Sequence, residues 1–326
     1  MGAGEPAVRS LRLRACAKLN LGLEVLGKRE DGYHELRTIF QTIDLHDDVL
    51  ITLRPRGIEV ACDDPAVPVG EANLAWRAAR DLQRYGRVAG GVRIELRKRI
   101  PVGAGLGGGS SDAAAVLMGL NRLWRLDIGA ERLRLLAVRL GADVPYFLVG
   151  GTAVGVGRGD EVYPLREQIR CRVVVAFPGP SVSTAAVFDR VDSSLTLRES
   201  GHIIIRFIAR RLEGGSGYEA LSNQLEEAAL VEAPELAERV RKIRGILVRE
   251  RALLASLTGS GSAYFGLFDD ASAATRARAA LQAAGFGAFR GRTLPLDQYR
   301  RMWVPSSSRS GKERTSWRSR TSRSSR

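Results

Sequence analysis

Residues 10 to 60 alternate apolar and polar side chains almost without a break, which is the two-residue period of β-strands. In this stretch Leu19 and Leu21 fall on one face of the predicted strand, whereas Lys18 and Asn20 fall on the other. An exposed lysine on a strand is commonplace, so the spacing alone leaves the role of Lys18 open. The pattern predicts an initial sheet whose polar face carries an ammonium and an amide.

The pattern then changes to helical spacing. Apolar residues recur three and four positions apart over 73–85, 112–123 and 130–140, which predicts three helices. Beyond a boundary near Leu165, further strands and helices follow up to about residue 292, among them a helix over 218–230. This order, in a chain of 326 residues, favours two packed domains of mixed α and β structure. The expected parts are an N-terminal domain over 1–165, a C-terminal domain over 166–305 and a tail over 306–326.

A glycine-rich segment lies between a predicted strand and a predicted helix. It passes from glycines into two serines and then into Asp112, near which we expect the helix to begin. Glycines let backbone amides close around a ligand, and the start of a helix offers free N–H groups and a positive dipole end. Such a segment is typical of a phosphate-binding site. The candidate loop comprises Pro101, Val102, Gly103, Ala104, Gly105, Leu106, Gly107, Gly108, Gly109, Ser110 and Ser111.

Other glycine motifs fit this segment less well. A P-loop needs a lysine directly after its last glycine, whereas Gly108 is followed by Gly109 and Ser110, so the Walker A motif is excluded. A dinucleotide-binding unit requires a buried parallel strand before the glycines, but residues 92–99 alternate apolar and charged side chains. A flexible loop without a ligand would not require a hydroxyl pair and an abrupt helix start.

Three further side chains are candidates for a site. An Asp-Gly turn at 31–32 is followed by Tyr33 and His34, where side chains can meet a ligand, although a partly buried histidine without a ligand is the ordinary alternative. Asp143 precedes Pro145 and a predicted helical turn, so it can cap that helix. A capping aspartate is held rigidly, which a positioned base also requires, so both roles stay open.

The net charge of +14 suggests a nucleic-acid-binding protein until the charges are located. Seven basic residues and one acidic residue lie in the Ser- and Arg-rich segment 306–326, which we expect to be disordered. The remaining excess is spread over predicted helices and favours anionic small molecules. Three widely spaced cysteines in no metal-binding pattern, and the lack of a bilayer-length apolar stretch, predict a cytoplasmic protein with neither membrane nor nucleic acid as partner.

Three segments together resemble the motifs of the GHMP kinases, the superfamily of galactokinase, homoserine kinase, mevalonate kinase and phosphomevalonate kinase. They are residues 101–115, 141–147 and 258–265, and the likeness covers about residues 10–300. Each motif alone is weak, but the set in this order is specific. The resemblance implies a two-domain α+β fold, with an N-terminal domain like ribosomal protein S5 and a C-terminal ferredoxin-like α/β domain. It also implies phosphoryl transfer from ATP, with Mg²⁺, to an alcohol.

Two more segments, 17–21 and 31–36, narrow this resemblance. With the triple glycine before Ser110, they resemble the members that phosphorylate the 2-hydroxyl of a cytidine diphosphate-linked methylerythritol, in the non-mevalonate route to isoprenoid precursors. A superfamily member acting on homoserine or mevalonate, and a basic nucleic-acid-binding protein, are the alternatives. A panel of alcohol substrates and the salt dependence of binding would separate them.

The resemblance also implies catalytic roles. Asp143 would accept or orient the proton of the attacking alcohol, and Lys18 would stabilise the charge between this carboxylate and the γ-phosphate. Asn20 would hold the erythritol hydroxyls. The loop 101–111 would surround the ATP phosphates, with one serine of its pair at Mg²⁺, and no carboxylate is assigned to the metal.

Around the base, the resemblance implies an aromatic sandwich. Tyr33 and Phe188 would stack on the two faces of cytosine, and His34 would form hydrogen bonds with its edge. Thr184 would lie near ATP or the substrate, and the loop 259–261 would flank the site. These expectations define a small-molecule site with one nucleotide and one alcohol.

Overall fold

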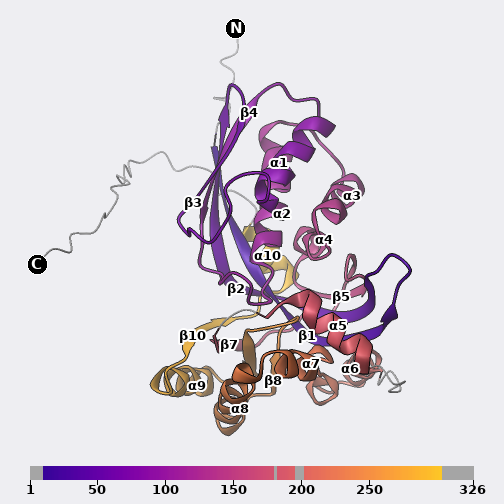
Figure 1. The fold of residues 1–326 in the computed structure, drawn as a ribbon, viewed down its shortest axis with the longest axis vertical. Helices are drawn as coiled ribbons and strands as arrows, with labels where there is room; N and C mark the ends of the chain where they lie inside the picture. Colours follow the sequence, from indigo (N-terminus) through magenta and orange to yellow (C-terminus); the bar gives the residue numbers. More distant parts are fainter. Residues whose placement is uncertain (1–9, 180–181, 195–201, 303–326) are drawn as a thin grey trace, which may run out of the picture.

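The computed structural model describes residues 10–179, 182–194 and 202–302 of the chain. This part contains two sheets, each packed against its own helices (Figure 1). The segment 306–326, predicted to be disordered, lies outside the described residues. Within the described segments, no helix is both long and apolar enough to cross a membrane.

The first sheet is built on a long hairpin. β1 (Ser10–Lys28) pairs antiparallel with β2 (His34–Arg54), and the alternating pattern over 10–60 accounts for the length of both strands. β2 also pairs with β4 along one half and with β5 along the other. The sheet order is β3-β4-β2-β5-β6, with β3 at Ile58–Cys62, β4 at Gly91–Arg97, β5 at Thr152–Gly157 and β6 at Glu161–Pro164.

Four consecutive helices pack on this sheet and form most of the first core (Figure 1). Ala78 and Leu82 of α1 and Leu117 of α2 are fully buried in one cluster with Val49 and Ile51 of β2. Their three- and four-residue spacing gives each helix an apolar face, so packing follows from the sequence pattern. The helices are α1 (Leu74–Tyr85), α2 (Gly108–Leu123), α3 (Ala130–Leu140) and α4 (Val144–Val149).

The second sheet is antiparallel, in the order β10-β7-β9-β8. Side chains of β7 alternate between two cores, as a strand buried on both faces requires: Val174 packs with helices α7 to α9, and Val175 packs towards the hairpin. The strands are β7 (Arg172–Phe177), β8 (Leu254–Leu257), β9 (Tyr264–Phe268) and β10 (Gly287–Arg292). The helices of this part are α5 (Thr184–Ser194), α6 (Ile203–Leu212), α7 (Leu225–Glu232), α8 (Pro234–Arg249) and α9 (Ala271–Ala283). The terminal helix α10 (Leu296–Met302) returns to the first core, where its Tyr299 is buried.

The hairpin joins the two sheets. Leu19 and Ile39 are fully buried in one apolar cluster with Phe265 of β9. Further along β1, the N–H of Leu23 donates to the carbonyl of Ser222 and its carbonyl accepts from the N–H of Gln224, at 3.0 Å each. The strand that carries Lys18 and Asn20 is therefore fixed on both sides.

The structure corrects two of the predicted elements and adds two that were not predicted. The helix expected to begin near Asp112 begins at Gly108, because Gly107 takes the left-handed conformation (φ 72°) that ends the loop earlier. A single helix over 218–230 is replaced by a 3₁₀ turn at Tyr218–Ala220 followed by α7, because the backbone between them pairs with β1. The short strand β8 and the helix α10 had no clear sequence signal.

We expect Leu267→Ala to lower the free energy of unfolding by about 2–5 kcal/mol, because Leu267 is fully buried in the cluster that joins hairpin and second sheet. Leu212→Ala is the matched control. Leu212 is 79 % exposed, so the same substitution should change stability by less than about 0.5 kcal/mol. Urea unfolding followed by circular dichroism measures both, and equal losses would contradict the assignment of this core.

Candidate active site

Three segments far apart in sequence meet at the ammonium of Lys18. Its Nζ donates to Oδ1 of Asn20 at 2.6 Å, and it lies 3.4 Å from Oδ2 of Asp143. Lys18 is only 4 % exposed, whereas the side chain of Asp143 is 36 % exposed. Gly259 lies beside the same ammonium, in the segment 258–262, which we call the second glycine loop. The site thus pairs a buried ammonium with a carboxylate that is partly exposed to solvent.

Asp143 occupies the capping position of α4 without making the capping bond. Its backbone begins the helix ahead of Pro145, but its carboxylate accepts no hydrogen bond from the first helical turn. The carboxylate is directed to Lys18 instead. Of the two roles that the sequence left open, the side chain does not perform the structural one.

A hydrogen-bonded chain holds Asn20 in place. Its Nδ2 donates to Oγ1 of Thr38 at 2.9 Å, and that hydroxyl in turn donates to the carbonyl of Gly22. The backbone N–H of Asn20 donates to Oγ1 of Thr258 at 3.0 Å. Because both strands of the hairpin and the second glycine loop take part, the amide oxygen stays aimed at Lys18.

The candidate phosphate loop lies directly beside Lys18 and borders a cleft of about 370 Å³. The carbonyl of Leu106 accepts from the N–H of Lys18 at 3.0 Å, which ties the loop to β1. Gly105 (φ 76°) lies so close to the second glycine loop that a Cβ would be 2.2 Å from the carbonyl oxygen of Thr258. The cleft is lined by every residue from Pro101 to Ser110, and by residues of the segment 66–74.

The two serines of the motif have different environments. Ser111 is fully buried, and its hydroxyl donates to the carbonyl of Cys16 at 2.7 Å. Ser110 is half-buried and lines the cleft at the first turn of α2. Of the pair, Ser110 is the one whose side chain can reach a ligand there.

Sequence reasoning missed a buried charge cluster beneath this loop. The ammonium of Lys98 donates to Oδ2 of Asp47 and, at 2.7 Å, to Oδ2 of Asp112. Asp47 also accepts from the backbone of Arg99 and Ile100, whereas Oδ1 of Asp112 is buried without a partner. The signal available in the sequence was a lysine that ends an alternating strand and an aspartate that follows a serine pair.

Burial raises the pKa of Asp112 to about 7, against the opposing effect of Lys98. Burial lowers the pKa of Lys98, but Asp112 and Asp47 outweigh it, so the net shift is upward. Asp112 is the single carboxylate among the described residues that line the cleft. Mg²⁺ is commonly held by one or two carboxylates together with substrate phosphates, so the free Oδ1 fits such an ion.

The residues expected around a base gather at the far end of the hairpin, but in a different pairing. The ring of His34 stacks on Phe188, with centroids 4.6 Å apart and planes at 20°. Tyr33 is 55 % exposed, and the guanidinium of Arg158 lies 4.8 Å from its ring centroid. The sandwich of a base between Tyr33 and Phe188 stays a prediction.

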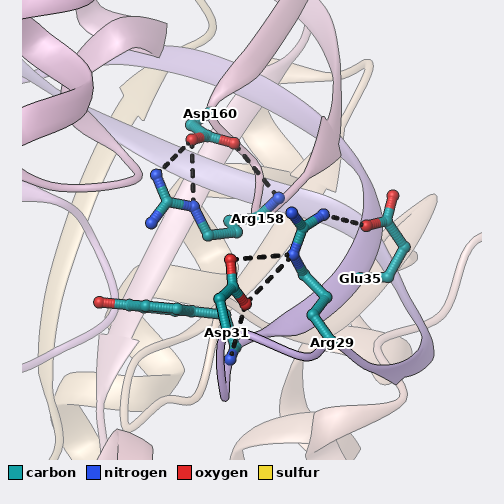
Figure 2. Close-up of polar contacts among 6 residues, drawn as sticks. Arg29, Asp31, Glu35, Arg158 and Asp160 are labelled. Carbon is teal, nitrogen blue, oxygen red and sulfur yellow. Dashed lines mark hydrogen bonds and ion pairs between the residues drawn. The ribbon is translucent and has the colours of Figure 1, made fainter.

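A network of ion pairs surrounds Tyr33. Arg158 pairs with Asp160, and Arg29 pairs with both Asp31 and Glu35 (Figure 2). Asp31 also accepts from the backbone N–H of Tyr33 at 3.1 Å, so the Asp-Gly turn is built as the sequence predicts. The guanidinium of Arg158 thus lies beside an exposed aromatic ring, and that of Arg29 is held by the turn that carries this ring.

Thr184 begins α5, one turn before Phe188. Its hydroxyl is 2.8 Å from that of Ser260, in the second glycine loop. It thereby connects α5 with the segment that lies beside Lys18 and Gly105.

Comparisons with known proteins show the family to which the chain belongs. Residues 73–151 match the family described as GHMP kinases N terminal domain, and residues 214–286 match GHMP kinases C terminal. The fold is similar to the crystal structure of homoserine kinase from Cytophaga hutchinsonii, with a TM-score of 0.74 over 92 % of this chain and 99 % of that one, at 19 % identity. The chain is a GHMP kinase.

Similarity in sequence narrows this class. The chain is 43 % identical to the 4-diphosphocytidyl-2-C-methyl-D-erythritol kinase of Citrifermentans bemidjiense, over 88 % of this chain and all of that one. The crystal structure of a 4-(cytidine 5'-diphospho)-2C-methyl-D-erythritol kinase superposes with a TM-score of 0.70 and 37 % identity, over 87 % of this chain and 99 % of that one. The chain belongs to the 4-diphosphocytidyl-2-C-methyl-D-erythritol kinase family.

We expect Asp112→Asn to change how stability depends on pH. The pKa of Asp112 is raised from 3.8 to about 7. In the pH window between these two values, the folded chain therefore holds a proton that the unfolded chain has released. The quantity to compare is the free energy of unfolding of the unmodified chain minus that of the variant. This difference should fall as pH rises through the window, by at most about 1.4 kcal/mol per pH unit. Urea unfolding of both proteins across the window measures the difference, and a constant difference would contradict the shift.

Proposed function

We propose that this chain transfers the γ-phosphoryl group of ATP to the 2-hydroxyl of 4-diphosphocytidyl-2-C-methyl-D-erythritol. The reaction is a step of the methylerythritol phosphate route to isoprenoid precursors, and we assign it to the cytoplasm. The observation that carries the proposal is the pair of Lys18 and Asp143 beside the glycine loop, in a chain 43 % identical to a kinase of this name.

The pair has the chemistry that an attacking alcohol needs. Asp143 is exposed enough to meet the hydroxyl and takes or orients its proton as the oxygen attacks phosphorus. Lys18 neutralises charge that develops between the carboxylate, the alcohol oxygen and the γ-phosphate. Asn20 holds the neighbouring hydroxyls of the erythritol. Positioning and charge neutralisation account for most of the catalysis in phosphoryl transfer.

The loop 101–111 and the start of α2 bind the ATP phosphates in this proposal. Glycine amides and the free N–H groups of the helix point towards anionic oxygens, and the helix dipole adds positive potential. Oδ1 of Asp112 and the hydroxyl of Ser110 would hold Mg²⁺, and the ion would supply positive charge against the phosphates. This assignment also gives the unpartnered oxygen of Asp112 a function.

The far end of the hairpin binds the cytidine diphosphate. Tyr33 and Phe188 supply stacking surfaces, His34 contacts the edge of the base, and Thr184 lies on the same helix face towards the ATP side. Arg158, beside Tyr33 and paired with Asp160, offers N–H donors on the side where the diphosphate would approach.

The direct test incubates the purified chain with ATP, Mg²⁺ and the cytidine diphosphate-linked alcohol. We expect a new phosphomonoester signal in ³¹P NMR, with the diphosphate bridge intact. Homoserine and mevalonate are the comparison acceptors, because the fold alone is shared with kinases of both. Faster phosphorylation of either one than of the cytidine compound would reject the proposal.

We expect Asp143→Asn to lower kcat by roughly 10² to 10⁴, the usual effect of removing a positioned acid or base. The affinity for ATP, measured by calorimetry with a non-hydrolysable analogue, should change little because the loop is left intact. Asp189→Asn removes an exposed aspartate of α5 and serves as the control with normal turnover. Near-normal kcat in Asp143→Asn would reject the assignment of the base.

Gly105→Ala should weaken ATP binding by about tenfold or more. The added Cβ would meet the carbonyl oxygen of Thr258 at 2.2 Å in a left-handed conformation, and strain of about 1–3 kcal/mol displaces the loop. Gly129→Ala is the matched control, since its Cβ would meet no atom within 4 Å and its φ is −67°. Unchanged ATP affinity in Gly105→Ala, by the same calorimetry, would show that the loop does not hold the phosphates.

A further inference from the structure

One face of α5 carries Thr184, Phe188 and Asp192, each four positions from the last. The helix is anchored through Val187 and Val191, which are buried in the core of the second sheet. The face with Phe188 and Asp192 is turned to the end of the hairpin, because Asp192 contacts His34 at the start of β2. Figure 1 shows α5 beside this part of the hairpin. Thr184 and Phe188 already belong to the proposed substrate site, and Asp192 completes the row.

Asp192 bridges a cross-strand pair of the hairpin. Lys28 and His34 are register partners in β1 and β2, so their side chains emerge on the same face. Oδ2 of Asp192 accepts from Nζ of Lys28 at 2.7 Å, and its Oδ1 lies 2.6 Å from Nε2 of His34. Phe188 covers the face of the same imidazole. The ring of His34, 8 % exposed, is thus fixed by one face and one edge.

This geometry determines which ring nitrogen carries the proton. The hydrogen bond from the Lys28 ammonium lowers the pKa of Asp192 most, and the bond with His34 lowers it further. Asp192 is therefore a carboxylate. A carboxylate can only accept a hydrogen bond, so Nε2–H of His34 must donate to it. Nδ1 makes no hydrogen bond with any residue in the described segments. In the neutral ring, Nδ1 is therefore a free acceptor.

We propose that Asp192 is a positioning residue that makes the site select cytosine over uracil, by fixing the Nε2–H tautomer of His34. The inference rests on the proposed function, in which His34 faces the edge of the base. At that edge cytosine presents an amino group, which donates to Nδ1, whereas uracil presents a carbonyl oxygen. Two acceptors facing each other leave both unpaired, which disfavours uracil.

The tautomer can be read without any substrate. The full-length chain contains only three histidines, so a ¹⁵N–¹H correlation spectrum of the imidazoles can be assigned with the variants His46→Gln and His202→Gln. We expect the Nε2–H form for His34 in the unmodified chain and in Asp189→Asn, which removes an exposed carboxylate one turn away. Asp192→Asn should show a mixture of tautomers, because an amide can accept from Nε2–H or donate to a bare Nε2. An Nδ1–H form in the unmodified chain would overturn the proposal.

Base selection is measured as the ratio of kcat/KM for the cytidine diphosphate-linked alcohol to that for its uridine counterpart. Asp192→Asn should lower this ratio by roughly tenfold, the value of one hydrogen bond, mainly through KM. Asp189→Asn should leave the ratio unchanged. An unchanged ratio in Asp192→Asn would also overturn the proposal. If neither alcohol were phosphorylated by the unmodified chain, the proposed function would fail, while the spectra would still decide the tautomer.

Discussion

A buried ammonium is the constraint around which this molecule is arranged. Lys18 is almost fully removed from water, and an unpaired charge in that position would cost several kcal/mol. The amide oxygen of Asn20 and the carboxylate of Asp143 offset this cost, and the ring of Phe40 lies 5.7 Å from the charge. Since the carboxylate comes from another segment, the sheet, the helix α4 and the loops have to be assembled correctly before the charge is neutralised.

The hairpin of β1 and β2 is what allows those segments to meet. One half of it belongs to the core with α1 to α4, and the other half to the core shared with the second sheet. Lys18 lies where the two halves join, next to a shift in the strand register between Cys16 and Lys18. The far end carries His34. A single pair of strands therefore spans the distance between the proposed phosphoryl-transfer and base-binding regions.

Much of this arrangement could be predicted from the sequence. Strict alternation identifies the hairpin strands, and the glycines, serines and helix former of 101–115 indicate a candidate phosphate loop, because both signals are local. The start of α2 was misplaced because the conformation of Gly107 depends on its surroundings, and the helix over 218–230 was broken by pairing with β1. Such long-range contacts produce no periodic pattern of apolar residues in the sequence.

The same limit explains the residues that were missed. Asp112 and Lys98 are separated in sequence by a loop, and only the fold shows that Lys98 pairs with both Asp112 and Asp47. Asp192 is part of a helical row, but its partners lie more than 150 positions away. Residues named by resemblance, such as Lys18 and Asp143, were found because their motif was matched and not because their contact could be derived.

The contact between the two glycine loops has a consequence for inhibitors that compete with ATP. Gly105 and Thr258 lie 153 positions apart, yet the carbonyl of one segment leaves no room for a methyl group on the other. A substitution that adds bulk to the second loop would push the first one towards the proposed nucleotide site. Drug resistance can therefore arise in the C-terminal half, at residues that never touch the compound.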